Sequence, residues 1–521
     1  MKKRLKPVII TLVILAALTG GGIYFLTRDG GKSSQFAGRV ESEQSDQSED
    51  RAYNFEIGKT AVELQLSGDK KNVLNFDNDG VFRVDSSTAA RERLDRVIKK
   101  KDVSFEEPLI AANPFGTNEN SFYFYFTTSY RGMVRYTITV EDESIPDHVR
   151  YVDNGQENNL ATDHEFVVSG LVPGMTNYII LEVLDSTGAG RDKRTYVYTP
   201  SAAGLSSKLA VEKGKSKELC ENGLFFLFPK GDKNIYMYDN SGILRNVVAT
   251  ESGHGGRFYQ SGDSAIYQVS DTKAIKVSAI GRVTGVAEIK GYGAIRDFGY
   301  DGYDNIYCLV RKKKRDVIVA SSFSSGKTKK VYTFPKGVKA HSLMLTEDGG
   351  GYISCDKPAG IMKMEALAST RPSVSFILGK KADWKAIAKN DKRYKKKVKE
   401  DDTVIHWDTA GAVLNSKEAD SSGTKTAMST YLVDHNKGTG MLFTVDSKEK
   451  KVEVATKLPT NQGEYAGGYA LVKHFVLSDM NSGIYTEYDE EGKVVKKFSL
   501  GQGMTGIAKM TLNQMCFYNG K

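Results

Sequence analysis

The stretch 234–247, NIYMYDNSGILRNV, decides the fold of this chain, because its design returns five more times before the C-terminus. A run of aromatic and β-branched residues, a short polar turn and a second such run are typical of two strands joined by a tight turn. The other copies are AIYQVSDTKAIKVSAIGRV (265–283), NIYCLVRKKKRDVIVAS (305–321), GGYISCDKPAGIMKM (350–364), STYLVDHNKGTGMLFTVDSKEKKVEV (429–454) and HFVLSDMNSGIYTEYDEEGKVVKKF (474–498).

Six copies, most of them roughly 30 to 50 residues apart, predict a six-bladed β-propeller over residues 201–521. A blade of four short strands needs that length, and a closed ring of blades leaves no exposed sheet edge. We expect the last apolar stretch, QMCFYNG (514–520), to close the ring by completing the first blade.

A shorter region ahead of the repeats also has the pattern of strands. Aromatic and β-branched residues cluster in SFYFYFTTS (121–129), GMVRYTITVED (132–142), DHEFVVSGLV (163–172) and NYIILEVLDS (177–186), between turn-forming residues. Four strands with no helical periodicity between them predict a small β-sandwich at 102–200. One helix is expected just before it, in SSTAARERLDRVIKKK (86–101).

The N-terminus predicts a membrane anchor. A basic tail, residues 1–6, precedes about twenty uncharged residues assigned to 7–27, enough to cross a hydrocarbon core of roughly 30 Å. The basic tail is expected to stay in the cytoplasm, which places the rest of the chain outside. The apolar run is long for a cleaved signal peptide, and no A-x-A site follows it, which favours an uncleaved signal-anchor. Residues 28–101 are then a polar linker and N-terminal extension.

These patterns together predict an all-β protein, in which an N-terminal β-sandwich is followed by a six-bladed β-propeller behind a single transmembrane helix. The expected location is the cell membrane, with one crossing and the bulk of the chain extracytoplasmic. An exported chain can hold disulfides. Cys220, Cys308, Cys355 and Cys516 allow three connectivities, and buried free thiols are an equal alternative.

The charge of the chain is modest, +9 over 521 residues, and much of it lies in one stretch. Residues 380–400, KKADWKAIAKNDKRYKKKVKE, carry most of the excess of Lys and Arg over acidic residues. A distributed nucleic-acid surface is therefore not expected. A solvated basic loop or short helix is the plain interpretation of this stretch, and a local anion-attracting patch is the alternative.

EEPLIAANPFGTNENSFYFYFTT (106–128), followed by VRYTITVED (134–142), resembles the N-terminal domain of the bacterial aryl-sulfate sulfotransferases. Asn113 to Thr117 is the most recognisable element of this resemblance. The likeness continues, in the order of that family's blades, through AIYQVSDTKAIKVSAIGRV, GYGAIRDFGYDGYDNIYCLV (291–310), KAHSLMLTEDGGGYISCD (339–356) and SVSFILGKKADW (373–384).

The resemblance implies sulfuryl transfer from an aryl sulfate donor to a phenolic acceptor, through a histidine in the central funnel and without the nucleotide donor PAPS. The chain has no phosphate-binding Gly-rich Lys-Ser/Thr loop. A loose transition state spreads negative charge over the sulfuryl oxygens, so the site needs a neutral imidazole, fixed donors and a proton for the phenolate. No cofactor and no metal are expected, because this chemistry requires neither and no His/Cys cluster has zinc-like spacing.

Carried over position by position, the family's site is incomplete here. The nucleophile falls on His406, the first histidine after FILG (376–379), although Ile405 stands where the family has Gln. The family's paired His before Asp-Phe falls on Ile295 and Arg296. A permanent cation thus replaces one imidazole.

The remaining positions of the family's site are also altered. The His-x-Asn pair falls on His341 and Leu343, and the arginine of the following strand is replaced near Asp356 and Lys357. A rival alignment would place Tyr465 in the nucleophile position.

Two functions therefore remain open. In the first, the chain is an active sulfotransferase with His406 as nucleophile, His341 as acid and base, Arg296 and Lys357 binding the sulfuryl oxygens, and Tyr465 in substrate contact. In the second, the propeller has lost transfer and binds an anionic ligand or a surface partner, since residues of such a site act as a unit. The donor, the acceptor and self-association into a homo-oligomer are not determined by the sequence.

Overall fold

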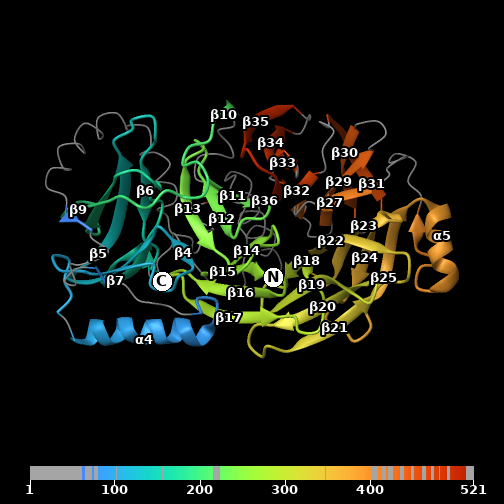
Figure 1. The fold of residues 1–521 in the computed structure, drawn as a ribbon, viewed down its shortest axis with the longest axis horizontal. Helices are drawn as coiled ribbons and strands as arrows, with labels where there is room; N and C mark the ends of the chain where they lie inside the picture. The colour runs from blue at the N-terminus through green and yellow to red at the C-terminus, as the bar shows by residue number, and fades with distance from the viewer. Residues whose placement is uncertain are drawn as a thin grey trace, which may run out of the picture.

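The fold is described from a computed structural model of the chain. It describes residues 62–64, 73–74, 80–100, 102–154, 157–214, 223–346, 348–399, 409–413, 418–419, 426–434, 439–446, 451–459, 465–470, 474–479, 482–489 and 493–511. An N-terminal sandwich lies at one side of the molecule, helix α4 (Val84–Lys100) runs along its base, and a succession of small sheets makes up the rest (Figure 1). Both the sandwich and the helix were predicted from the sequence.

The N-terminal sandwich is built on one long strand, β5 (Phe122–Val140). Its first half pairs with β3 (Leu109–Ala112) and β7 (Ala161–Val168), and its second half with β6 (His148–Tyr151) and β8 (Asn177–Leu184). The outer strands are β9 (Gly190–Tyr198), β1 (Val62–Glu63) and β2 (Val73–Leu74).

The separate strands predicted at 121–129 and 132–142 are therefore wrong, since both belong to β5. No residue between them leaves the extended conformation, and a shift in register between Thr127 and Gly132 carries the strand from one set of partners to the other. Phe124, Phe166, Leu181 and Tyr196 fill the space between the layers.

The described part of the second region contains six antiparallel sheets, each with a path of at least four strands. Five of the six repeats form the second and third strands of one sheet, and the first, 234–247, forms the third and fourth strands of its sheet. The sheets run from the inner strand outward as β36-β11-β12-β13, β14-β15-β16-β17, β18-β19-β20-β21, β22-β23-β24-β25, β27-β29-β30-β31 and β32-β33-β34-β35.

The strands of the first three sheets are β11 (Gly223–Pro229), β12 (Asn234–Tyr238), β13 (Leu244–Ala249), β14 (Phe258–Ser261), β15 (Ser264–Ser270), β16 (Lys273–Ser278), β17 (Val283–Glu288), β18 (Ile295–Tyr300), β19 (Asn305–Lys312), β20 (Arg315–Ser322) and β21 (Thr328–Thr333). Those of the last three are β22 (Lys339–Leu345), β23 (Gly351–Lys357), β24 (Ala359–Glu365), β25 (Ser373–Gly379), β27 (Thr409–Val413), β29 (Thr426–Asp434), β30 (Thr439–Asp446), β31 (Lys451–Pro459), β32 (Tyr465–Ala470), β33 (His474–Asp479), β34 (Ile484–Asp489) and β35 (Val494–Ser499). Short added strands are β10 (Val211–Gly214) on β35, β26 (Val398–Lys399) on β25 and β28 (Glu418–Ala419) on β29.

The first sheet takes its inner strand, β36 (Met504–Thr511), from the C-terminal end of the chain. Inner strands of neighbouring sheets contact each other, β18 with β22, β22 with β27, β27 with β32 and β32 with β36. Gly256, ahead of β14, lies against Thr505 and Gly506 of β36. The first sheet is thus completed from the C-terminal region, as predicted, although the strand that does so is 504–511. The stretch 514–520 lies outside the described residues.

The motif Asn113 to Thr117 joins the sandwich to the first two sheets. Asn113 and Gly116 adopt positive φ, which turns the chain so that β4 (Asn118–Glu119) adds to the edge strand β13. The Thr117 hydroxyl donates to the carbonyl of Gly281 at 2.5 Å. Helix α4 reaches the same hairpin, where the amide of Val283 donates to the Ser87 hydroxyl at 3.0 Å.

The other predictions from the sequence have mixed outcomes. The basic stretch forms α5 (Lys381–Asn390) followed by turns, in agreement with a short helix. Cys308 and Cys355 are buried free thiols, while Cys220 and Cys516 lie outside the described residues. In the described part of the chain, no helix is long and apolar enough to span a membrane, and residues 7–27 lie outside that part.

We predict that the sheets depend on β36. A chain ending at residue 503 removes the partner of β11 together with the buried side chains of Met504 and Ile507. Each buried side chain of this size is worth roughly 2–5 kcal/mol, so cooperative unfolding of the sheets should be lost or shifted to much lower urea. Urea titration followed by tyrosine and tryptophan fluorescence measures this. A chain ending at residue 513 keeps β36 and is the control; equal destabilisation of both chains would show that 514–521 closes the first sheet instead.

Candidate functional site

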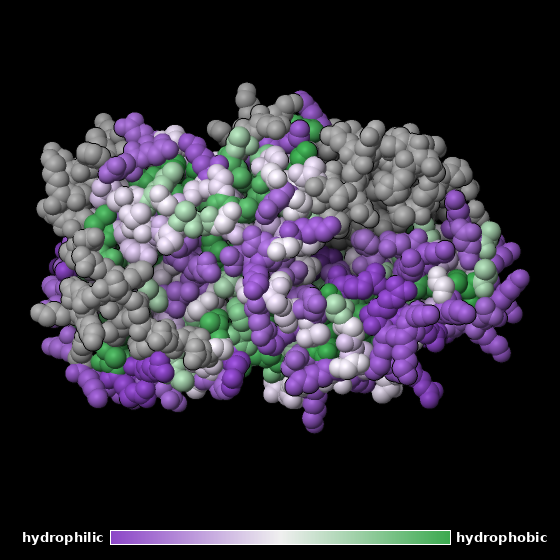
Figure 2. Space-filling view, in the orientation of Figure 1, coloured by the Kyte–Doolittle hydropathy of each residue, from purple (hydrophilic) through white to green (hydrophobic). Residues whose placement is uncertain are grey.

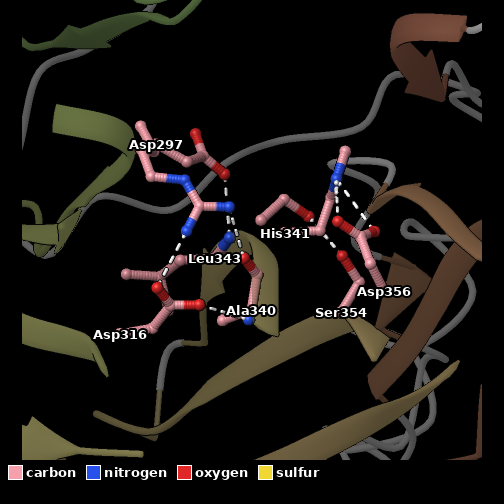
Figure 3. Close-up of polar contacts among 9 residues, drawn as sticks. Asp297, Asp316, Ala340, His341, Leu343, Ser354 and Asp356 are labelled. Carbon is pink, nitrogen blue, oxygen red and sulfur yellow. Dashed lines mark hydrogen bonds and ion pairs between the residues drawn. The ribbon is translucent and has the colours of Figure 1, made fainter. Parts of the chain in front are cut away.

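His341 lies near the start of inner strand β22, at a β-bulge. Ala340 pairs with Cys355 and Ser342 pairs with Ser354, so His341 has no partner opposite it on β23. Bulges re-aim a side chain relative to the sheet and are common next to active sites. The Nδ1 atom of His341 lies 3.1 Å from one carboxylate oxygen of Asp356 and 3.3 Å from the other (Figure 3). A histidine held through Nδ1 by a carboxylate presents Nε2 for chemistry, as in catalytic triads.

Arg296 occupies the matching position on the neighbouring inner strand, β18. Ile295 pairs with Val310 and Asp297 pairs with Leu309, which leaves Arg296 at a bulge of its own. The Arg296 Nη2 atom donates to the carbonyl of Ala340 at 2.7 Å, next to His341 in the chain. The structure therefore brings together two of the three residues that the sequence assigned to catalysis.

Two buried carboxylates hold β22 on either side of His341. Asp316 accepts the amide of Ala340 at 2.7 Å, and Asp297 accepts the amide of Leu343 at 2.8 Å (Figure 3). An inner strand has one edge without a partner strand, so its amides on that edge need other acceptors. The two carboxylates supply them from the neighbouring sheet, which fixes the backbone around His341.

Each of these carboxylates also binds an arginine. Asp297 receives two hydrogen bonds from Arg257, from Nε at 2.8 Å and Nη2 at 3.0 Å, and Asp316 receives one from Arg296 Nη1 at 3.1 Å. The Arg257 and Asp297 side chains are only 14% and 7% exposed, so this pair is screened little by solvent. Arg257 lies just ahead of β14, which means that the Asp297 carboxylate connects three successive sheets.

The charge balance of the site differs from the one predicted. Arg296 is neutralised by Asp316, and the carboxylate of Asp356 lies where the family resemblance would put a cation. Burial acts to lower the pKa of His341, but the hydrogen bond and charge of Asp356 outweigh it, and the pKa is raised above its usual value. The Asp356 carboxylate therefore favours the protonated form of His341.

The remaining predicted residues are not joined to this cluster by described contacts. Lys357 ends β23, directly after Asp356, and is exposed. His406 lies outside the described residues, three positions ahead of β27, the inner strand that contacts β22. Tyr465 begins β32, and its side chain also lies outside the description.

Sequence reasoning missed the acidic residues that organise the site. Asp297 and Asp316 each stand at the start of an apolar strand, IRDFGY and RDVIVASS, where a buried acid is unusual and could have served as the indication. It also passed over Thr505, which sits at the bulge of inner strand β36 and contacts His254 Nδ1 at 3.3 Å. A bulge therefore recurs in at least four described inner strands, at Arg296, His341, Ala466 and Thr505.

Two cavities among the described residues lie away from this cluster. One of about 710 Å³ is lined by α4 and β17, and another of about 290 Å³ lies beside it. Neither has a residue of β18, β22 or β23 in its wall. Within the described part of the chain, no three His, Cys, Asp or Glu side chains are grouped so as to hold a metal ion.

Comparison with protein families gives one match. Residues 109–201 match the model of the arylsulfotransferase Ig-like domain. The match covers the sandwich and includes the turn at 113–117, and it supports the resemblance drawn from the sequence. A search of curated proteins gave no match.

Several solved structures are similar to parts of the chain at low identity. A chain of a nidogen/laminin complex is 11% identical, with a TM-score of 0.38, and the match covers 55% of this chain and 98% of that one. A protein from Lactobacillus plantarum is 12% identical, with a TM-score of 0.36 and coverage of 73% and 99%. BamB from Moraxella catarrhalis is 10% identical, with a TM-score of 0.28 and coverage of 63% and 86%. These similarities are too weak to indicate a function.

We predict that Asp356 sets the protonation of His341. In an NMR titration of the folded chain, the imidazole of His341 should titrate above the usual value of about 6.5, and Asp356→Asn should lower its pKa. Because the folded pKa is the higher one, the stability contributed by this pair is present below the unfolded pKa and lost as the pH rises through the folded pKa. Lys357→Met, a change at the adjacent exposed position, is the control. An unchanged His341 titration in Asp356→Asn would disprove the pairing.

Proposed function

We propose that the protein is an arylsulfotransferase-like enzyme that moves a sulfuryl group from an aryl sulfate to a phenol through a sulfo-histidine, without a nucleotide donor. The observation that carries the proposal is the His341–Asp356 pair at a bulged inner strand beside Arg296, in a chain whose residues 109–201 match the arylsulfotransferase Ig-like domain. We further infer that the six sheets form a six-bladed β-propeller over 201–521, following a sandwich at 102–200. Inner-strand contacts from β18 to β36, together with Gly256 against β36, support a closed ring.

In the first half of the proposed reaction, His406 attacks the sulfur of the aryl sulfate. A nitrogen–sulfur bond forms, the bond from sulfur to the aryl oxygen breaks, and the phenolate leaves with the bonding electrons. His341 donates its proton to that oxygen, and Asp356 supports this role because it raises the pKa of His341 and so favours the protonated form. A phenolate, with a reference pKa of about 10, is a poor leaving group without such a proton.

In the second half, the acceptor phenol gives its proton back to His341 and attacks the sulfo-histidine. The nitrogen–sulfur bond breaks, and His406 is released. No net proton is gained or lost over one cycle, because His341 gives one proton to the leaving phenolate and receives one from the acceptor phenol.

The sulfuryl oxygens carry the negative charge of the loose transition state and need fixed donors. Lys357 is an exposed cation directly after Asp356 on β23, whereas Arg296 is already engaged by Asp316. We therefore assign oxyanion binding to Lys357 and a positioning role to Arg296. Tyr465 stays a candidate for substrate contact from β32.

One observation favours a second function, a propeller that binds an anionic ligand or a surface partner and no longer transfers sulfuryl groups. Arg257 and Arg296 are both neutralised by buried carboxylates, and Asp356 adds a negative charge beside His341. A sulfate ester gains less from such a site than from one with free cations.

The proposed setting is the cell membrane, with residues 7–27 as a single anchor and the rest of the chain extracytoplasmic. The basic tail and apolar run of the sequence support it. Protease added to intact cells should then remove the sandwich and the propeller, and protection of both would reverse this orientation.

The direct test of transfer is capture of the covalent intermediate. Incubated with 4-nitrophenyl sulfate and quenched rapidly, the wild-type chain should carry sulfate on His406 by peptide mass spectrometry, and His406→Ala should lose both the adduct and nitrophenol release. His341→Gln should slow turnover by roughly 10²–10⁴, because the leaving phenolate loses its proton donor. Donors with more acidic phenols should be affected least.

Tyr465→Phe is the matched control and should leave both readouts largely intact. A wild-type chain that binds aryl sulfates and forms no adduct would contradict transfer and favour the binding function. An adduct on Tyr465 in place of His406 would show that the rival alignment is the correct one.

A further inference from the structure

We propose that the end of the molecule around His341 carries a binding face for a linear anionic polysaccharide. The face, called here the basic face, is made by connections within and between two neighbouring sheets. Its residues are Arg311, Lys312, Lys313, Lys314, Arg315, Lys336, Lys339, Lys357, Lys380, Lys381, Lys385, Lys389, Lys392, Arg393, Lys395, Lys396 and Lys397. Nothing in this proposal rests on sulfuryl transfer, because it uses residues outside the catalytic assignments apart from Lys357.

Strand register places all of these connections at one end of the two sheets. In the sheet of β18, Ile295 pairs with Val310, so the hairpin 311–315 lies at the end where β18 begins. Thr333 pairs with Val317 at that same end, and the chain then passes through Lys336 into β22.

The next sheet repeats this orientation. Lys339 pairs with Lys357, and Gly360 pairs with Gly379, so the β23–β24 hairpin and the segment that follows β25 lie where β22 begins. The hydrogen bond from Arg296 to the carbonyl of Ala340 shows that β18 and β22 begin side by side. The basic face therefore surrounds the end of the sheets at which Arg296 and His341 lie.

The charges of the face are almost entirely of one sign. Its lysines are exposed, apart from the half-buried Lys397, and none of them has a carboxylate partner among the described residues. The acids at this end include Asp297, Asp316 and Asp356, which are already engaged by Arg257, Arg296 and His341. The others are Asp391, which binds Arg393, and the exposed Asp271 and Asp383. Hydrophilic side chains cover the surface around α5 and the sheet beside it (Figure 2).

The lysine-rich segment is anchored, so its charges are presented on a fixed framework. Trp384 of α5 is fully buried, and its ring stacks on that of Tyr394 at 5.9 Å. The Tyr394 hydroxyl lies 2.7 Å from that of Tyr332 in β21, and Arg393 lies over the Tyr332 ring at 4.6 Å. A fixed array loses less entropy on binding an extended ligand than a disordered basic tail would.

Two classes of anionic partner, lipid bilayers and single-stranded nucleic acids, are bound through side chains that the face lacks. Basic surfaces that dock on bilayers combine cations with exposed apolar side chains that enter the lipid. The exposed large hydrophobic residues of the described chain are Val84, on α4, and Tyr303, in the turn at the opposite end of β18. Single-stranded nucleic acid is bound by aromatic stacking platforms. In this face Trp384 and Tyr394 are buried, and the ring of the half-buried Tyr292 is covered by Lys312 at 4.1 Å.

A partner with many negative charges, no bases and no apolar phase fits these properties. Sulfated or carboxylated polysaccharides have this chemistry. Their charges repeat along a flexible chain, so they can follow the face from the 311–315 hairpin to α5. Binding of such a polymer releases its counterions and should weaken steeply with salt.

The test uses the full chain held in nanodiscs of neutral phosphatidylcholine and a fluorescent heparin fragment as the probe. We expect binding at about 0.15 M salt, with Lys385→Glu/Lys389→Glu raising Kd at least roughly tenfold and reducing the salt slope by about 2. Both lysines are exposed one turn apart on α5. The matched control is Lys99→Glu/Lys100→Glu, which makes the same charge change at the exposed end of α4 and should alter Kd by less than about twofold.

Three outcomes overturn the proposal. The first is a wild-type chain that does not bind heparin, and the second is equal weakening by the two charge-reversal pairs, which would reflect net charge alone. Displacement of heparin by phosphatidylglycerol vesicles or by a single-stranded oligonucleotide at lower charge concentration would assign the face to a bilayer or a nucleic acid. His406→Ala should bind heparin as the wild type does, so failure of transfer and failure of this proposal are separate results.

Discussion

The buried carboxylate of Asp297 is the contact on which the candidate site depends. It binds Arg257 ahead of β14, belongs to β18, and accepts the amide of Leu343 in β22, so one side chain connects three successive sheets. Ion pairs of this kind contribute little net stability compared with apolar packing, because both charges must be taken out of water. Loss of one partner is costly, about 3–5 kcal/mol, because the other is left buried and unpaired. The pair therefore specifies the arrangement of the inner strands more than it stabilises the fold.

That arrangement determines what His341 can do. The bulge in β22 frees the histidine from the regular pairing of the strand, while Asp297 and Asp316 hold the backbone on either side of it. Asp356 then fixes the ring through Nδ1 and raises its pKa. The same geometry neutralises Arg257 and Arg296, which leaves the surrounding lysines as the main source of positive potential. A site that is locally neutral and bordered by a strongly basic end would attract anions over a distance and hold them by few direct contacts.

The sequence predicted the succession of sheets because its strands are made of aromatic and β-branched residues bounded by polar turns, and such strands are recognisable one at a time. The prediction failed where the extent or the place of a strand depended on partner strands that are distant in the chain. The sequence predicted two strands in residues 121–142. The structure has one, because β5 continues through Tyr130 and Arg131 and its two halves pair with different strands. The first sheet is completed by β36, which has a weaker apolar pattern than 514–520 but buries Met504 and Ile507 against it.

At the candidate site, the sequence identified His341 and Arg296 but misjudged their surroundings. The three carboxylates lie 15, 24 and 46 residues along the chain from the groups they bind in β22, and only the strand register brings them together. Local sequence patterns carry no information on which bulge faces which neighbouring acid. The basic stretch at 380–397 could likewise be predicted as a short helix, whereas its alignment with the 311–315 hairpin at one end of the sheets required the strand pairings.

Amide hydrogen exchange of β22 in Asp297→Asn tests the central claim most directly, that buried carboxylates from the neighbouring sheet fix the backbone around His341. Peptides covering 339–345 should exchange markedly faster than in the wild type, while peptides covering β24 and the sandwich strand β8 should be unchanged. Unchanged exchange across 339–345, in a variant that remains folded, would show that β22 is held by its own sheet and would contradict the account.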